Sequence, residues 1–220
     1  MSTSWTPRPQ PDAPGEGVRL PETTRLETFS DGVFAIAITL LVLEIKVPNG
    51  EVVSQHGGLW PALGALWPSY VGYTISFVTI GIMWANHHSI FQYVRHTDRR
   101  FLLINVLFLM GIGFLPFPTA VLAEHLPDAA TRLAATMFYG ATLVVIAVLF
   151  NAVWWSGIWK GRLLGRDIDH AGVQVITERY RLGPIGYLVA LGAAPLSVWL
   201  SLGIHLTLAL FFTRAERPGA

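Results

Sequence analysis

Residues 25–46 read RLETFSDGVFAIAITLLVLEIK, and this stretch decides how the rest of the chain is interpreted. A short polar group at its start is followed by a run from Gly32 to Leu43 in which Thr39 is the only polar side chain. Glu44 and Lys46 close the run. At a rise of about 1.5 Å per residue, a helix of this length crosses a hydrocarbon layer of about 30 Å. The stretch therefore predicts a first membrane-spanning helix that ends before Pro48.

The apolar residues of this helix follow an alternating spacing of four and three, which places them on one face. The stripe consists of Phe29, Val33, Ile36, Leu40, Leu43 and Val47. Asp31 lies roughly 160° away from it at 100° per residue. We therefore expect Asp31 to point toward neighbouring helices.

The composition is that of a polytopic membrane protein. Of 220 residues, 52% are hydrophobic and 13% are charged, whereas soluble domains carry about 25% charged residues. The chain has no cysteine, which excludes disulfides and thiolate metal sites. The basic residues are dispersed without aromatic interleaving, so nucleic acid is not an expected partner.

Several further apolar blocks predict an all-α fold with one membrane domain over residues 22–213. Residues 1–21 form a proline-rich stretch, interpreted as a disordered tail, and residues 214–220 a short cytoplasmic tail. We expect a polar loop over 47–60 and an aqueous basic segment over 160–181. The expected later helices cover residues 61–92, 101–123 with a break near Pro116 and Pro118, 133–158, and a block over 182–212 that turns near Gly192 and Pro195.

The charge distribution favours six spans with both termini in the cytoplasm. That arrangement places 13 of the 15 basic residues inside, as the positive-inside rule requires. The two outside are Lys46 and Arg132. With five spans, Arg214 and Arg217 would also lie outside.

The spacing of Arg25, Phe29, Ser30 and Asp31 at the start of a first membrane helix resembles the R-x-x-x-F-S-D signature of the transmembrane protein 175 family. The resemblance implies a potassium channel of the prokaryotic single-repeat type in the bacterial cell membrane. The motif occurs once in this chain, so the resemblance implies four chains per pore. Potassium is the expected permeant ion, and no cofactor is expected.

The resemblance also implies where the pore is narrowest. Ile36 matches the family position that forms the tightest ring, and Leu40 and Leu43 add rings on the same face. Rings of branched aliphatic side chains gate by excluding water. From the residues alone, the stripe is equally interpretable as lipid-facing or core-packing. Thr39 either ligates a partly dehydrated cation or bonds back to its own helix.

The second expected feature is a structural polar network between the first two long helices. An acid at mid-helix costs about 2.5–3.5 kcal/mol on insertion scales, so Asp31 needs partners. Its predicted partners lie late in the second helix, at Trp84, Asn86, His87 and His88, and the motif residues Arg25, Phe29 and Ser30 are assigned to the same network. Adjacent histidines point about 100° apart, which disfavours a metal site. A proton relay stays open.

Two functions remain. The sequence lacks a Ser/His/Asp set, paired carboxylates and a phosphate loop, so an enzyme is not expected. The first function is a passive potassium-selective channel without a T-V-G-Y-G filter. The alternative is a proton-coupled secondary transporter with a pathway through Asp31, His87 and His88 inside each subunit. The apolar midplane of the first helix favours the channel.

Overall fold

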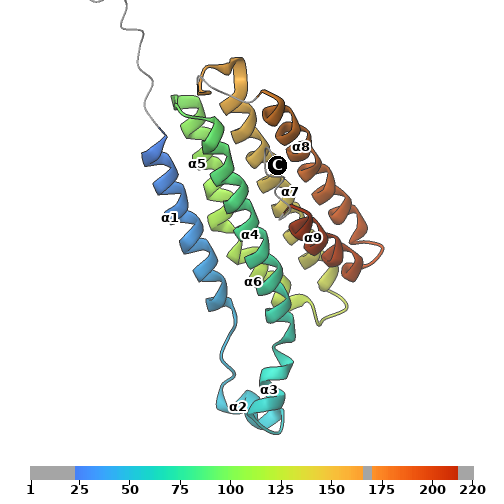
Figure 1. The fold of residues 1–220 in the computed structure, drawn as a ribbon. Coiled ribbons are helices and arrows are strands. Elements are labelled where there is room, and N and C mark those ends of the chain that lie inside the picture. Colours follow the sequence, from blue (N-terminus) through green and yellow to red (C-terminus); the bar gives the residue numbers. More distant parts are fainter. Residues whose placement is uncertain (1–22, 166–169, 213–220) are drawn as a thin grey trace, which may run out of the picture.

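The computed structural model describes residues 23–165 and 170–212, and those residues form a bundle of helices. The helices run up and down side by side, with α2 and α3 projecting at one end (Figure 1). An isolated bridge joins Val94 and Leu164. The α-helices are α1 (Thr24–Leu40), α2 (Gly50–Gln55), α3 (Leu59–Ala65), α4 (Trp67–Tyr93), α5 (Arg99–Phe114), α6 (Pro116–His125), α7 (Arg132–Ile158), α8 (His170–Ala193) and α9 (Val198–Phe212), and the 3₁₀ turns are Leu41–Glu44 and Trp159–Gly161. The predicted tails at residues 1–21 and 214–220 lie outside the described residues.

Among the described residues, three helical segments are long and apolar enough to cross a membrane. They are Thr24–Glu44, Arg99–His125 and Arg132–Ile158. The first is the predicted first span, whose last turn tightens into the 3₁₀ geometry common at helix ends. The all-α fold class is thus confirmed, while the count of six spans stays a prediction.

Two segments that were expected outside the long apolar helices, one polar and one basic, contain helices. The predicted loop over 47–60 contains α2 and the start of α3. Asn49 caps α2, because its side chain accepts a hydrogen bond from the Val52 amide at 2.9 Å. The second long helix therefore begins only at Trp67, with a proline in its first turn. The segment over 160–181, expected to be aqueous and basic, contains the start of α8 at His170. Charged residues lower the hydropathy of the first half of α8, so a hydropathy pattern does not identify that half as part of an apolar helix.

The two predicted breaks are confirmed. α5 ends at Phe114 and α6 begins at Pro116, so the third span is interrupted at its proline. The last apolar block is divided between α8 and α9, with a connection over 194–197. Pro184 is accommodated inside α8.

The core lies around α7, which packs against α5 on one side and α8 on the other. Its largest fully buried side chains include Trp154, Tyr139 and Phe108. Buried hydroxyls add a polar link, because Ser76 on α4 lies 2.7 Å from Thr119 on α6 and 3.0 Å from Tyr139 on α7. α1 lies at the edge of this bundle against α4 and α5 (Figure 1).

Candidate functional site: two faces of the first helix

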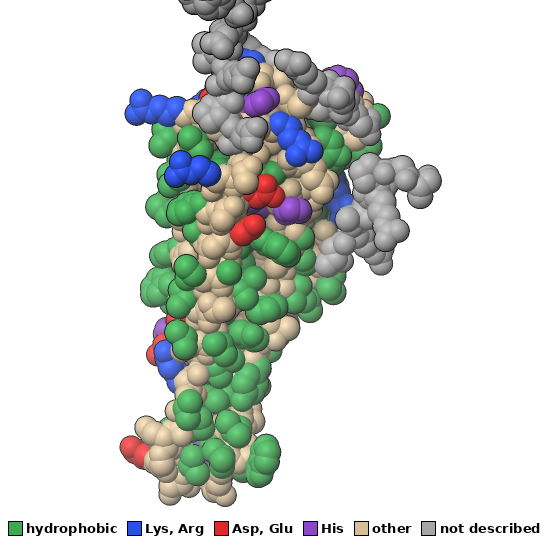
Figure 2. Space-filling model, turned by 60° about the vertical axis from the view of Figure 1, so that its left-hand side comes forward, with side chains coloured by type: hydrophobic (Ala, Val, Ile, Leu, Met, Phe, Trp, Pro, Cys, Tyr) green, Lys and Arg blue, Asp and Glu red, His purple; other side chains and the backbone are tan. Residues whose placement is uncertain are grey.

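One face of α1 and its 3₁₀ turn is buried and the other is free. The buried face consists of Leu26, Ser30, Phe34, Ala37 and Leu41. On the opposite face, Phe29, Ile36 and Leu43 are 57%, 61% and 64% exposed. Figure 2 is turned to bring the α1 side of the molecule forward, and it shows hydrophobic side chains along the middle with charged ones nearer the ends.

The exposed face holds the residues that the sequence assigned to the constriction. Ile36, Thr39, Leu40 and Leu43 are all exposed in the single chain. The hydroxyl of Thr39 donates to the carbonyls of Ala35 and Ile36, at 3.0 and 2.9 Å. The Thr39 hydroxyl therefore bonds back to its own helix, which is the second of the two alternatives given for it above. The core-packing interpretation of Ile36 does not hold within one chain.

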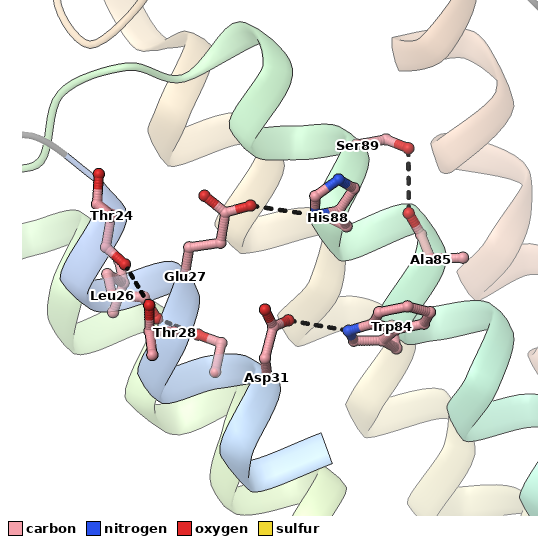
Figure 3. Close-up of polar contacts among 10 residues, drawn as sticks. Thr24, Leu26, Glu27, Thr28, Asp31, Trp84, Ala85, His88 and Ser89 are labelled. Carbon is pink, nitrogen blue, oxygen red and sulfur yellow. Dashed lines mark hydrogen bonds and ion pairs between the residues drawn. The ribbon is translucent and has the colours of Figure 1, made fainter. Parts of the chain in front are cut away.

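On the side of α1 that faces α4, two acids meet partners from that helix (Figure 3). The indole nitrogen of Trp84 donates to the Asp31 carboxylate at 2.9 Å. One turn away along each helix, His88 lies 3.0 Å from the Glu27 carboxylate. Both contacts are partly accessible, so each is worth less than a fully buried pair.

A second link is fully buried and runs through a residue that the sequence analysis missed. The Asn105 amide on α5 donates to the Ser30 hydroxyl at 3.0 Å, and its carbonyl lies 2.8 Å from Nε2 of His87. Ser30 in turn donates to the Leu26 carbonyl at 2.8 Å. The His87 ring packs against both Phe34 and Phe108, with ring centroids 5.5 and 5.4 Å away, and those two rings also contact each other. One amide therefore connects α1, α4 and α5.

Known proteins are similar in sequence to this chain along most of its length. The model of the family described as "Endosomal/lysosomal potassium channel TMEM175" matches residues 25–116. A potassium channel from Chamaesiphon minutus is 50% identical over 191 residues, which cover 87% of this chain and 93% of the relative. The chain belongs to the TMEM175 family. A potassium channel from Streptomyces collinus is 46% identical over 198 residues, covering 90% of this chain and 94% of that one.

The fold agrees with that assignment. The crystal structure of a TMEM175 homolog from Chamaesiphon minutus, described as a lysosomal potassium-selective channel homolog, superposes with a TM-score of 0.79 at 46% identity. The match covers 87% of this chain and 96% of that one. The helical bundle described above is therefore the TMEM175 fold.

Some residues assigned to the network of this TMEM175 member make no contact with it within the single chain. Arg25 is exposed and makes no ion pair or side-chain hydrogen bond with the described residues. Phe29 lies on the free face. The Asn86 amide donates to Ile82 of its own helix, and its backbone carbonyl accepts from Tyr180 at 3.1 Å. Asn105 could have been found as the lone amide in the uncharged third span.

The described residues contain no group of three or more ligands suited to a metal ion. His87 and His88 instead contact different partners on different helices, Asn105 on α5 and Glu27 on α1. This separation follows from their adjacent positions, which point about 100° apart on a helix.

Proposed function

We propose that this TMEM175 member is a potassium-selective channel that conducts passively and needs no cofactor. Each chain supplies six spans with both termini in the cytoplasm, and four chains surround one axis in the bacterial cell membrane. Two relatives that match almost the whole chain are named potassium channels. The concentration of basic residues at one side of the predicted topology supports the orientation.

The observation that carries the proposal is the free face of α1. It is contiguous and apolar apart from Arg25 and Thr39, whereas the opposite face packs against α4 and α5. Four copies facing a common axis would bring Ile36, Leu40 and Leu43 into successive rings. The Ile36 ring, near the middle of the span, forms the constriction, and it gates by excluding water.

Selectivity then arises at a helix-lined constriction without a conventional filter. The fragment Val71-Gly72-Tyr73-Thr74 lies within α4, where backbone carbonyls are occupied by helical hydrogen bonds. Gly72 is also buried, and a side chain there would meet Thr119 at 3.4 Å. These residues offer no ring of carbonyls to a cation.

The test exchanges the proposed constriction and measures reversal potentials in a planar bilayer. Ile36→Ala or Ile36→Asn widens the ring or makes it polar, so total cation current rises and sodium permeability approaches that of potassium. The matched control is Ile38→Ala on the same helix, because Ile38 is half-buried against the bundle core. It lowers the yield of assembled protein and leaves the ion preference of assembled channels unchanged.

A shift in ion preference at Ile38 with none at Ile36 would show that the pore lies on another face of α1. Potassium flux into liposomes, driven by a potassium gradient alone, distinguishes the channel from the transporter. A channel conducts under that condition, whereas obligatory coupling to protons abolishes the flux. The contacts favour the channel, since Asp31, His87 and His88 each pair with a different residue.

A further inference from the structure

A hollow at the arginine-rich end of the bundle has no part in the proposed pore. Its volume is about 120 Å³, and it lies between the start of α5 and the segment that follows α7. One water takes about 10–15 Å³ on this scale, so a group with several oxygen atoms fits. The lining residues are Asp98, Arg100, Ser156, Trp159, Arg162 and Leu163.

The backbone around this hollow is held in place from both sides. The amides of Arg95 and His96 both donate to the Leu163 carbonyl, at 2.9 and 3.2 Å, and the Gly165 amide donates to Tyr93 at 3.2 Å. Gly161 allows the turn between the end of α7 and Leu163, because its φ of +66° is unfavourable for residues with a side chain. These hydrogen bonds hold the backbone just before α5 against the segment that carries Arg162.

The charges in the hollow are unbalanced. Within the described residues, neither Arg100 nor Arg162 forms an ion pair. The one acid in the lining, Asp98, caps α5 by accepting a hydrogen bond from the Phe101 amide at 2.8 Å. Both arginines are exposed, and an anion bound between their guanidinium groups would offset their like charge. A guanidinium also matches phosphate oxygens with two parallel hydrogen bonds.

The position of the hollow indicates which phosphate it takes. It lies at the ends of two helical segments that are long and apolar enough to cross a membrane, and Trp159 at its edge is 56% exposed. Tryptophan is enriched at the depth of lipid head groups, where basic pockets bind anionic lipids. We propose that Arg100 and Arg162 bind the phosphate of an anionic phospholipid at this end of each subunit.

The test counts lipids that stay bound to the full chain. The protein is reconstituted in nanodiscs of equal phosphatidylglycerol and phosphatidylcholine, and native mass spectrometry then measures the retained lipids per subunit. Arg100→Gln and Arg162→Gln each lower phosphatidylglycerol retention at least about tenfold, because the loss of even one of the paired charge-assisted hydrogen bonds has that effect. Arg99→Gln is the matched control, because Arg99 is an exposed neighbour outside the hollow, and it leaves retention unchanged.

An equal loss at Arg99 would overturn the proposal in favour of diffuse surface charge. Displacement of the lipid by inorganic phosphate would overturn the assignment to a phospholipid. If a glutamine variant does not assemble, Arg100→Lys and Arg162→Lys keep the charge but lose the paired hydrogen bonds, and they must retain less phosphatidylglycerol than Arg99→Lys. Retention is measured without ion flux, so its outcome is independent of the proposed channel function.

Discussion

The buried amide of Asn105 is the contact whose loss should cost this TMEM175 fold most. Asn105→Ala removes the hydrogen bond to Ser30 and the one to His87, and all three side chains are buried. Interhelical hydrogen bonds in membranes average about 0.6 kcal/mol and reach about 1.7. Leaving a buried group without a partner adds about 1–3 kcal/mol. The expected loss in the free energy of unfolding is therefore about 2–4 kcal/mol.

Asn151→Ala is the matched control. Asn151 is also an amide in an apolar helix, but it is half-buried, and among the described residues it donates only to the Ala147 carbonyl of its own helix, at 3.0 Å. Alanine is the better helix former by up to about 0.7 kcal/mol, so this exchange should leave stability unchanged or slightly improved. Equilibrium unfolding in bicelles, followed by tryptophan fluorescence, measures both variants.

A double-mutant cycle makes the test sharper. Once Asn105 is alanine, Ser30→Ala should cost less than it does in the wild-type chain, because the two side chains share one hydrogen bond. Equal losses for Asn105→Ala and Asn151→Ala would refute the reasoning. If the stability losses of Ser30→Ala and Asn105→Ala were strictly additive, the proposed hydrogen bond between α5 and α1 would be refuted.

The other predictions concern close packing, topology and assembly. Gly157→Ala should lower stability by about 1–3 kcal/mol, because the new Cβ would lie 2.6 Å from a Val94 methyl group. Gly113→Ala is the control and should be tolerated, because its new Cβ would have nothing within 4 Å. Similar melting temperatures for the two variants would contradict this packing. Cysteine labels at Gly50 and Asp128 should react from outside the cell and a label at Arg217 only from inside, and an externally reactive Arg217 label would remove the sixth span. Native mass spectrometry in detergent should give a homotetramer, and a fully active monomer would favour the transporter.

Local rules were sufficient to predict which residues of α1 share a face and where the chain breaks, but not whether that face is buried. The spacing from Phe29 to Leu43 depends only on the turn of a helix; in the structure Phe29, Ile36, Leu40 and Leu43 are exposed, whereas Val33 packs against the core. Pro116 interrupts its span because a proline inside a helix removes a hydrogen bond. The direction of Asp31 followed from the same geometry, and Trp84 meets it from α4.

Contacts that depend on the depth of distant residues could not be predicted in this way. Asn105 meets Ser30 and His87 because the packing of three helices places those residues at the same depth in the bundle. The relative depth of residues on different helices cannot be read from a single sequence. The start of α8 was missed because its first half carries Glu178, Arg179 and Arg181, which a hydropathy pattern interprets as an aqueous segment.

Exposure alone does not make the free face of α1 a pore surface, since lipid tails are as apolar as leucine. What distinguishes this face is its polar residues: Arg25 and Thr39 share it with Ile36 and Leu43, and all four are exposed. A charged side chain is expensive against lipid and is normally directed toward a water-filled cavity or the interface. Thr39 donates its hydrogen within α1, so the middle of the face presents few donors to water. The proposed arrangement, an aqueous entrance beside Arg25 that leads to a water-excluding ring at Ile36, is compatible with these contacts.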